Sequence, residues 1–260
     1  MANNDNFKKM YKNGAQVGIV ALTVSGETQT PANIESWELD AYGKPTSLNI
    51  KNGATFIPSD YQRYNNSLTA VTLPNSITSI RSNAFAYCMG GFSINIPSGV
   101  TSTDGGIFAS SVILSDLSLP ASSFSTGSTA TGYSANWVSA FDGCELSGHT
   151  VTIENGVDII PRALFRNARN YTIVVPSSVT YLSPSCFGSS LASSGSERIV
   201  RFLGTTPPDE ASTTLNNSNS AWYSTSTNYL TGLRILVPGT KLNAYKTKYP
   251  EVANYIERDL

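Results

Sequence analysis

The stretch LTAVTLPNSITSIRSNAFAYC, residues 68–88, decides the fold of this chain. Val71 and Leu73 lie two residues apart, as apolar residues do on one face of a strand, and Pro74 ends that strand because it has no backbone N–H to donate. The apolar residues that follow are spaced by three to five, which favours a turn and a helical or 3₁₀ return. The segment therefore indicates one coil, made of a short strand, a corner and a return.

The same register returns every 23 residues on both sides of this coil. A fixed period of this length indicates stacked coils, because one coil is too small to bury its own apolar face. Six coils can be traced over residues 45–208, and the strand pattern recurs at 200–202 and 233–237. The residues that mark the register are Ile50, Leu73, Ile96 and Leu119, Ile57 and Ile80, and Phe85 and Phe108.

Residues 1–44 leave this register, and we interpret them as a β-rich cap or attachment segment. The strand-like stretches 20–24 and 35–41 are predicted to form a hairpin across a turn-rich linker. A secretory signal is the alternative for the apolar run 17–24, but the run is short, Gly18 interrupts it, and no convincing cleavage site follows. An ordinary strand is the preferred interpretation.

Residues 209–260 also depart from the period and are predicted to close the other end of the stack. They hold a polar insertion to about residue 231 and then the last strand. The final stretch, from Lys241 to Asp259, has apolar residues at helical spacing. It predicts an amphipathic closing helix that is interrupted at Pro250.

Composition excludes several classes of partner. The chain has 260 residues, with Lys+Arg 17 against Asp+Glu 18, and only 13% of residues are charged. A nucleic-acid or anionic-membrane partner calls for a basic patch, so neither is expected. No stretch approaches the roughly 18 to 20 apolar residues that span a bilayer, and we expect no membrane insertion. The three cysteines fit neither a metal-site spacing nor an even disulfide set, which predicts free thiols.

The repeat resembles a known family through two of its elements. These are the strand with proline and its Ile-x-x-Ile step, LPNSITSI at 73–80, and the Ala-Phe-x-x-Cys element, AFAYC at 84–88. Together they resemble the BspA-like, or Treponema pallidum type, leucine-rich repeats, over roughly residues 45–208. The endings GTTPP at 204–208 and VPG at 237–239 look similar to the closing segment of bacterial members.

The resemblance implies an α/β repeat solenoid. The expected fold is a right-handed leucine-rich-repeat coil with a parallel β-sheet on one face, an N-terminal β cap and a C-terminal capping helix. The resemblance also implies a non-catalytic surface module that adheres to proteins, cells or glycans. Neither a metal nor a cofactor is predicted.

Relatives on cell surfaces are usually exported, whereas a phage protein is released by lysis without a signal. Because the signal here is poor, we expect a phage virion component that attaches to a host through a surface protein or glycan. An exported bacterial surface adhesin is the first alternative. A purely architectural virion or envelope subunit is the second, with residues 1–44 docking to other subunits.

The outward residues of the strands are the first candidate binding surface. In a solenoid these positions line up into columns along the sheet. Short polar residues there can hydrogen-bond sugar hydroxyls or lie against a protein, although they also keep an exposed sheet soluble. The predicted ligand-binding column contains Asn49, Thr72, Asn95, Ser118 and Thr152, and its neighbour contains Ala70, Ser93, Asp116, Thr150 and Thr172.

Two polar insertions, 121–136 and 209–231, are the second candidate, because extra loops on a repeat array often supply its contacts. Aromatic rings in such loops offer rigid contact area with a polar edge. The alternative is that the tryptophans pack onto the coil beneath them. The predicted ligand-binding aromatics are Tyr133, Trp137, Trp222, Tyr223 and Tyr229.

Catalysis has little support in the sequence. The only histidine, His149, precedes a repeat strand without a nucleophile elbow or a zinc-binding helix around it, which favours a solvated turn residue. Two carboxylate pairs, Asp142 with Glu145 and Asp209 with Glu210, lack a ligand-rich loop, and we interpret them as solvated turns. No catalytic residue is therefore predicted.

Overall fold

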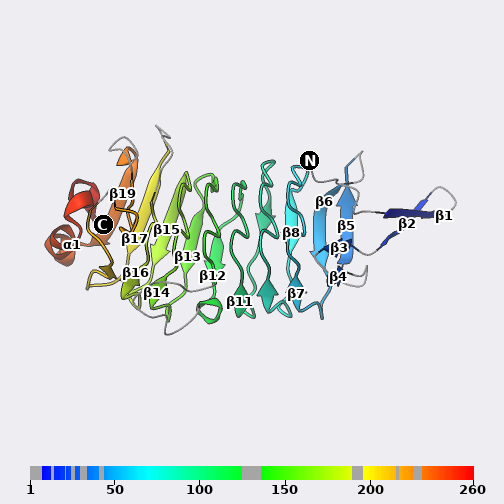
Figure 1. Cartoon of the computed structure of the whole chain (residues 1–260), viewed down its shortest axis with the longest axis horizontal. Coiled ribbons are helices and arrows are strands. Elements are labelled where there is room, and N and C mark those ends of the chain that lie inside the picture. The colour runs from blue at the N-terminus through cyan, green and yellow to red at the C-terminus, as the bar shows by residue number, and fades with distance from the viewer. Residues whose placement is uncertain are drawn as a thin grey trace.

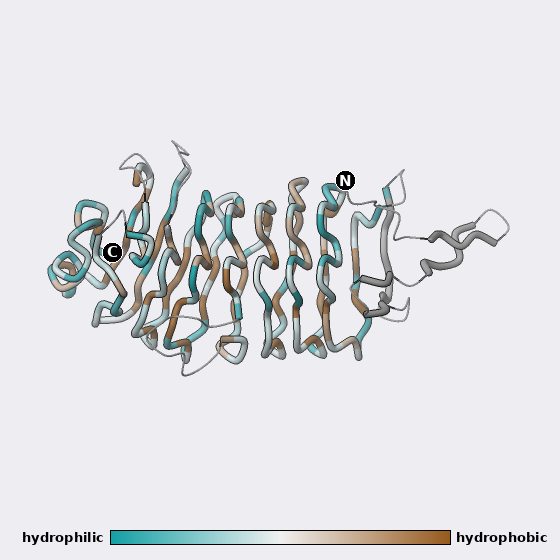
Figure 2. Tube along the Cα trace, viewed as in Figure 1, coloured by the Kyte–Doolittle hydropathy of each residue, from teal (hydrophilic) through white to brown (hydrophobic). Residues whose placement is uncertain are grey.

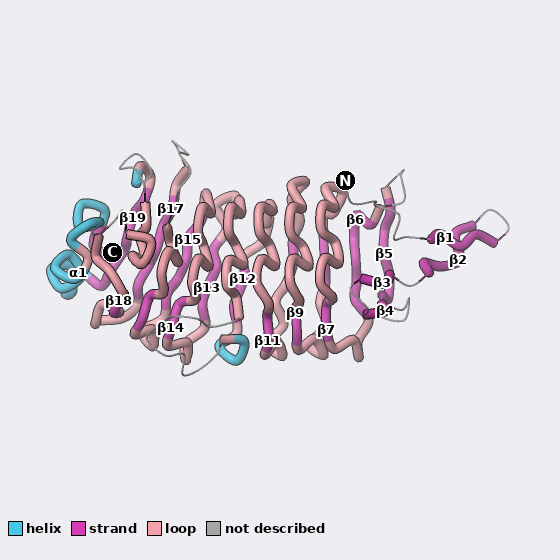
Figure 3. The backbone as a smooth tube through the Cα atoms, in the orientation of Figure 1, coloured by secondary structure: helices cyan, strands magenta, loops and turns pink. Residues whose placement is uncertain are grey.

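A computed structural model of the chain describes residues 8–12, 15–20, 22–24, 27–29, 34–40, 44–124, 136–188, 196–214, 217–224 and 230–260. Within these residues the chain forms a parallel β-solenoid of about eight turns, with its coils side by side along the long axis (Figure 1). Helix is scarce and gathers mainly at the C-terminal end (Figure 3). The predicted solenoid is confirmed.

The main sheet takes one strand from each coil. One series of parallel pairings joins β6, β8 and β10 in that order. A second series joins β12, β13, β15, β17, β19 and β20 in that order. A bridge between Phe92 and Ile113 connects the two parts. The strands are β6 (Pro45–Ile50), β8 (Ala70–Thr72), β10 (Ser93–Ile94), β12 (Leu117–Leu119), β13 (Thr150–Ile153), β15 (Tyr171–Val175), β17 (Arg198–Phe202), β19 (Leu233–Pro238) and β20 (Ile256–Asp259).

The period-two pattern of the sequence sets the register of this sheet. Inward residues are buried and their neighbours are exposed, which Figure 2 shows as alternating brown and teal along the coils. Equivalent apolar residues pair directly: Leu117 with Val151, Val151 with Ile173, and Ile173 with Val200. A slip of one residue would turn each of them to solvent, so the register is strongly specified.

A second, narrower sheet follows the corner at the end of each main strand. It forms two three-stranded groups, one on each side of the insertion that begins after β12. Its strands are β7 (Phe56–Ile57), β9 (Ser79–Ile80), β11 (Ser102–Thr103), β14 (Ile159–Ile160), β16 (Tyr181–Leu182) and β18 (Asp209–Glu210). In the coil between the groups a 3₁₀ turn, η2 (Ala121–Ser123), follows β12.

The return of each coil is a turn, so the predicted helical or 3₁₀ return is wrong. Two residues per coil, four apart, have a left-handed backbone. The first set contains Asp60, Asn83, Gly106, Ser139, Ala163 and Ser185, and the second contains Tyr64, Tyr87, Ser110, Gly143 and Asn167. Only two of these are glycine, and each of the others accepts a strain of about 1–2 kcal/mol. Asn and Asp tolerate this backbone better than most residues, but they do not require it, so the sequence alone does not specify it.

The hydrogen bonds explain why the strained turn persists. Successive N–H groups alternate between a partner within the coil and a carbonyl of the next coil. The N–H of Ala84 donates to Arg81 in its own coil, for example, while the N–H of Phe85 donates to Ile107 of the next. Such alternation satisfies the backbone and ties neighbouring coils together, which a helix closed on itself would not do.

The core is organised around a continuous aromatic spine. One ring per coil stacks on the next at centroid separations of 5.1–6.1 Å. Every member is at most 3% exposed. The spine contains Phe85, Phe108, Phe141, Phe165, Phe187 and Trp222. Each coil supplies one wall of its neighbour's interior, as the 23-residue period predicts.

The N-terminal segment is rich in strands, but its pairing differs from the prediction. The stretch 35–41 falls in β5 (Ile34–Leu39), which pairs antiparallel with β6 and so closes the main sheet. It does not form a hairpin with 20–24. Two separate antiparallel hairpins, β1 (Lys8–Lys12) with β2 (Ala15–Val20) and β3 (Leu22–Val24) with β4 (Glu27–Gln29), precede it. Figure 1 shows β1 and β2 beyond the end of the sheet.

The C-terminal end closes the stack with a short helix. After β19 the chain forms η4 (Gly239–Lys241), α1 (Leu242–Lys248) and η5 (Pro250–Tyr255). The interruption at Pro250 is confirmed, but the last residues form β20 instead of continuing the helix. The buried hydroxyl groups of Tyr245 and Tyr249 donate to the carbonyls of Gly204 and Pro208, at 2.9 and 2.7 Å.

The three cysteines are free and buried, as predicted. Burial raises the pKa of Cys88 to about 12, because a thiolate would lose its hydration inside the core. These thiols therefore serve as small core residues. In the part of the chain that the structure describes, no helix combines the length and the apolar character needed to cross a bilayer.

Candidate functional site

The outward face of the main sheet holds the predicted row of short polar side chains. The strand pairings place Asn49 beside Thr72, and Ser118 beside Thr152. Asn49 is half-buried, whereas Thr72, Asn95, Ser118 and Thr152 are exposed. Each strand adds one member to the row, so neighbours lie about 4.8 Å apart. The sheet thus presents a nearly uncharged polar surface.

The members of this row differ in whether their side chains already have hydrogen-bond partners in the fold. Asn95 is committed to the fold, because its side chain accepts from the N–H of Leu73 and donates to the carbonyl of Leu73, both at 2.8 Å. The hydroxyl of Ser118 donates to Glu154 at 3.0 Å. Thr72 and Thr152 have no hydrogen-bond partner among the described side chains. Their hydroxyl groups are available to a ligand.

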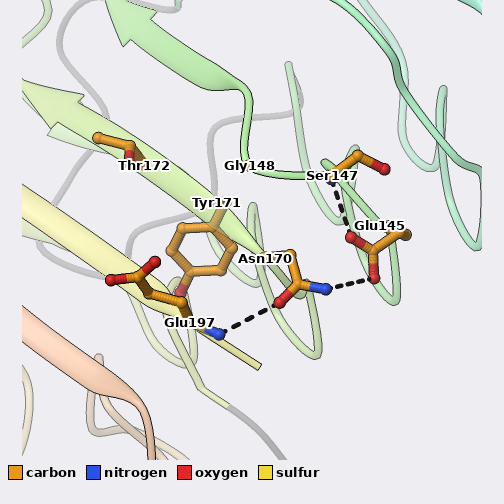
Figure 4. A pocket seen from close by; sticks show the side chains of 7 residues that line it. All are labelled: Glu145, Ser147, Gly148, Asn170, Tyr171, Thr172 and Glu197. Carbon is orange, nitrogen blue, oxygen red and sulfur yellow. Dashed lines mark hydrogen bonds between the residues drawn. The ribbon is translucent and has the colours of Figure 1, made fainter. Parts of the chain in front are cut away.

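A pocket of about 510 Å³ lies beside this row, at the edge where the chain enters β13, β15 and β17. Figure 4 shows its side chains converging from three successive coils. Thr172, from the second predicted column, links the pocket to the sheet face. The lining residues are Glu145, Ser147, Gly148, Asn170, Tyr171, Thr172 and Glu197.

A chain of hydrogen bonds fixes the shape of the pocket (Figure 4). Glu145 accepts from the N–H of Ser147 at 2.8 Å and from the amide of Asn170 at 3.0 Å. Asn170 in turn accepts from the N–H of Glu197 at 3.2 Å. Burial raises the pKa of Tyr171 to about 12, so its phenol stays protonated. The pocket therefore offers carboxylate and amide oxygens with an aromatic wall.

The insertion aromatics lie away from this surface. Trp137 and Trp222 are 0% and 1% exposed, so the prediction that their rings contact a ligand is wrong, and the alternative that they pack onto the coil is what the structure has. Trp137 stacks between Phe124 and Phe141, and Trp222 occupies the spine position of its coil. A buried ring of this size contributes a large apolar contact area to the core.

Of the remaining insertion tyrosines, the structure describes Tyr223. Tyr223 is partly exposed and follows Trp222 on the return side of its coil, away from the polar row. Tyr133 and Tyr229 lie outside the described residues. Their predicted role in binding stays a prediction. Of the insertion aromatics that the structure describes, none is brought together with the sheet row into one site.

His149 pairs with a carboxylate at the surface. Its Nδ1 lies 3.2 Å from Oδ1 of Asp116, and the N–H of Thr150 donates to the same oxygen at 2.8 Å. The bond from Thr150 is the main cause that lowers the pKa of Asp116, with His149 adding to it. Both side chains stay accessible, so the pair extends the polar surface next to the pocket.

The carboxylates interpreted as solvated turns have structural roles. Asp142 binds Arg166 and Asn167 of the next coil, and Glu145 bonds across coils to Asn170. Glu210 is partly buried and accepts from the N–H of Ala221 at 2.9 Å. The interpretation is therefore wrong for Asp142, Glu145 and Glu210, whereas the side chain of Asp209 is exposed and pairs with Lys248. Among the described residues, no three His, Cys, Asp or Glu side chains gather into a group that could hold a metal ion.

Comparison with known proteins agrees with this geometry. A family profile described as BspA type leucine rich repeat region matches the chain in six copies, over residues 34–137 and 55–191. The comparison with curated proteins finds no match. The matched residues make up more than half of the chain and coincide with the coils from β5 to β16. Repeats of this family are usually non-catalytic and are consistent with a binding module. The chain belongs to the BspA-type leucine-rich-repeat family.

Proposed function

We propose that the chain is a non-catalytic recognition module that binds a cell-surface protein or glycan through the outward face of its main sheet and the adjoining pocket. One observation carries the proposal. Thr72 and Thr152 have exposed hydroxyl groups without hydrogen-bond partners among the described residues. The inward side chains of the same strands are buried in the core. The fold does not need these hydroxyl groups, so they are free to serve a ligand.

The rigidity of the sheet supports the same function. Parallel strands tied to both neighbours hold each polar group at a fixed spacing, so little conformational entropy is lost when a ligand binds. The hydrogen-bond chain from Glu145 through Asn170 to Glu197 gives the pocket the same preorganisation. A repetitive ligand, such as a glycan chain or an extended protein surface, fits a repetitive row.

A large charged side chain introduced into the row tests the proposal. Thr152→Arg projects a long side chain from the centre of the sheet and is expected to weaken binding to a glycan array or to whole bacterial cells by about tenfold or more. Ser102→Arg is the matched control, because Ser102 is exposed on a short strand of the narrower sheet. Equal binding by the parent protein and both variants would reject the sheet face as the binding surface.

The setting of this binding is a separate proposal. A phage virion that attaches to its host is the setting we favour, with an exported bacterial adhesin as the alternative. Mass spectrometry of purified phage particles should detect the chain in the first case. Its recovery from the surface of intact bacteria, labelled with a membrane-impermeant reagent, would support the second and contradict the first.

An architectural subunit is the second candidate function. The two N-terminal hairpins precede the closing strand β5 and offer backbone edges to another subunit. Deleting residues 1–33 removes both hairpins and keeps β5. Loss of assembly with ligand binding intact would support docking through the hairpins, whereas loss of ligand binding would place recognition there.

A further inference from the structure

Two stacked tyrosines occupy strained positions on the surface. The rings of Tyr64 and Tyr87 lie 4.8 Å apart at an interplanar angle of 21°, and Tyr64 is 51% exposed. Both have a left-handed backbone, with φ of 63° and 60°. The matching positions of the next three coils hold Ser110, Gly143 and Asn167, which are small or tolerant of this backbone.

The fold gains little from tyrosine at these positions. Two bulky residues with a positive φ cost more than one aromatic pair returns, and a half-exposed ring adds little to the core. Observed strain of this kind on an exposed side chain points to a role in function.

Arg63 holds the tyrosine pair in place. Its guanidinium carbon lies 4.9 Å from the ring centre of Tyr64 and 5.4 Å from that of Tyr87. Its nitrogens donate to the hydroxyl of Tyr64 at 3.2 Å and to Oδ1 of Asp60 at 3.1 Å. The ring pair is therefore a preorganised platform, and Asp60 neutralises the charge of Arg63 beside it.

Uncharged groups from the next coil also border the platform. Met89 is 63% exposed beside it, and its N–H donates to the side-chain oxygen of Asn66 at 2.8 Å. Gly90 and Gly91 follow; a Cβ at Gly90 would lie 1.9 Å from the carbonyl of Asn66, so no side chain fits there. The platform is thus bordered by an amide, a thioether and bare backbone.

We propose that the Tyr64–Tyr87 platform binds a neutral glycan by stacking one sugar ring on the outer, exposed side of Tyr64, with Tyr87 stacked behind it. The apolar face of a pyranose matches an aromatic ring in size, and its hydroxyl groups can reach the amide and backbone at the rim. An anionic ligand would need an unpaired cation, and Arg63 is already paired with Asp60. A docked protein would need a far larger contact area than two rings supply.

This platform lies apart from the polar row and the pocket, so it is tested separately. The double variant Tyr64→Asn/Tyr87→Asn suits the left-handed backbone and is expected to unfold at a higher temperature than the parent. On an array of neutral and acidic glycans, it should bind neutral glycans about tenfold more weakly or worse. The control Leu203→Ser removes an equally exposed apolar side chain elsewhere and should bind as the parent does.

The outcomes distinguish this proposal from the proposed function. Weaker binding in the asparagine variant, with binding unchanged in Leu203→Ser, supports the platform whatever Thr152→Arg does. The proposal is overturned if the parent binds no neutral glycan, if it binds only acidic glycans, or if the asparagine variant binds as tightly as the parent. Loss of binding in Thr152→Arg alone would support the sheet face and overturn the platform.

Discussion

At the scale of the residue, the left-handed turn positions change how much stability an alanine-to-glycine substitution costs. Ala163 has φ of 53°, while Ala140 occupies a right-handed position one place later in the preceding coil, and both are buried. Glycine at 163 relieves strain of about 1–2 kcal/mol. The substitution also loses a buried methyl group, which costs about 0.8 kcal/mol. It adds conformational freedom to the unfolded chain, which costs about another 0.5–1 kcal/mol. These effects nearly cancel.

We therefore expect Ala163→Gly to leave the free energy of unfolding within about 0.5 kcal/mol of the parent. Ala140→Gly has no strain to relieve, so it should cost about 1.3–1.8 kcal/mol. Chemical denaturation followed by circular dichroism measures both values. Equal losses in the two variants would show that the backbone at Ala163 is unstrained.

The same scale shows why the tryptophans were misplaced from the sequence. Ser220, Ala221 and Trp222 repeat the order Ser185, Cys186 and Phe187, but a polar insertion separates them from their strand. The insertion hides the period, so Trp222 looked like a loop aromatic. In the structure the ring of Trp222 stacks on that of Phe187, with the ring centroids 5.1 Å apart, and so belongs to the aromatic spine. Composition alone could not reveal this, because a core ring and a contact ring have the same chemistry.

At the scale of the element, strands could be predicted and returns could not. Strands follow from the alternation of apolar residues and the proline that ends them, both local signals. The return depends on left-handed residues such as Ser139 and Ala163, whose side chains do not demand that backbone. The final strand β20 was missed because Ile256 fits a helical spacing equally well. Its pairing with β19 is a long-range contact that no local pattern records.

The C-terminal cap contains an acidic contact that should respond to pH. The carboxyl group of Glu210 on β18 lies close enough to that of Glu251 on η5 for the two groups to interact. Burial is the main cause that raises the pKa of Glu210, to about 8, and Glu251 adds to it. Asp209, Lys248 and Tyr249 lie around the pair. Folding therefore favours a protonated carboxyl group here.

Stability should consequently fall as the pH rises. Below pH about 4.5, Glu210 is protonated in both the folded and the unfolded state. Between about pH 4.5 and 8 only the folded state keeps this proton, so the free energy of unfolding decreases as the pH rises. Glu210→Gln should remove this slope and stabilise the protein by about 1–3 kcal/mol at pH 8, with little change at pH 4.5. Thermal unfolding across this range measures it. Glu197→Gln, on an exposed side chain, is the control, and parallel profiles for the parent and Glu210→Gln would contradict the prediction.

At the scale of the whole molecule, a solenoid is stable only if both ends are closed. Each inner strand has partners on both sides, but the outermost strands offer unpaired backbone groups to other chains. At the C-terminal end the exposed edge is β20, a strand of four residues that carries Glu257, Arg258 and Asp259. Short, charged edges resist pairing with a second molecule. The N-terminal end depends instead on β5.

Removal of β5 should therefore increase self-association of the protein. Deleting residues 1–39 uncovers β6, a six-residue strand whose Leu48 and Ile50 are buried, while deleting residues 1–33 keeps β5 in place. We expect the shorter deletion to remain monomeric, and the longer one to form dimers or larger species through the freed edge and to unfold at a lower temperature. Light scattering coupled to size-exclusion chromatography measures the difference. If both deletions stay monomeric and equally stable, β5 is an appendage, and the first coil closes the stack by itself.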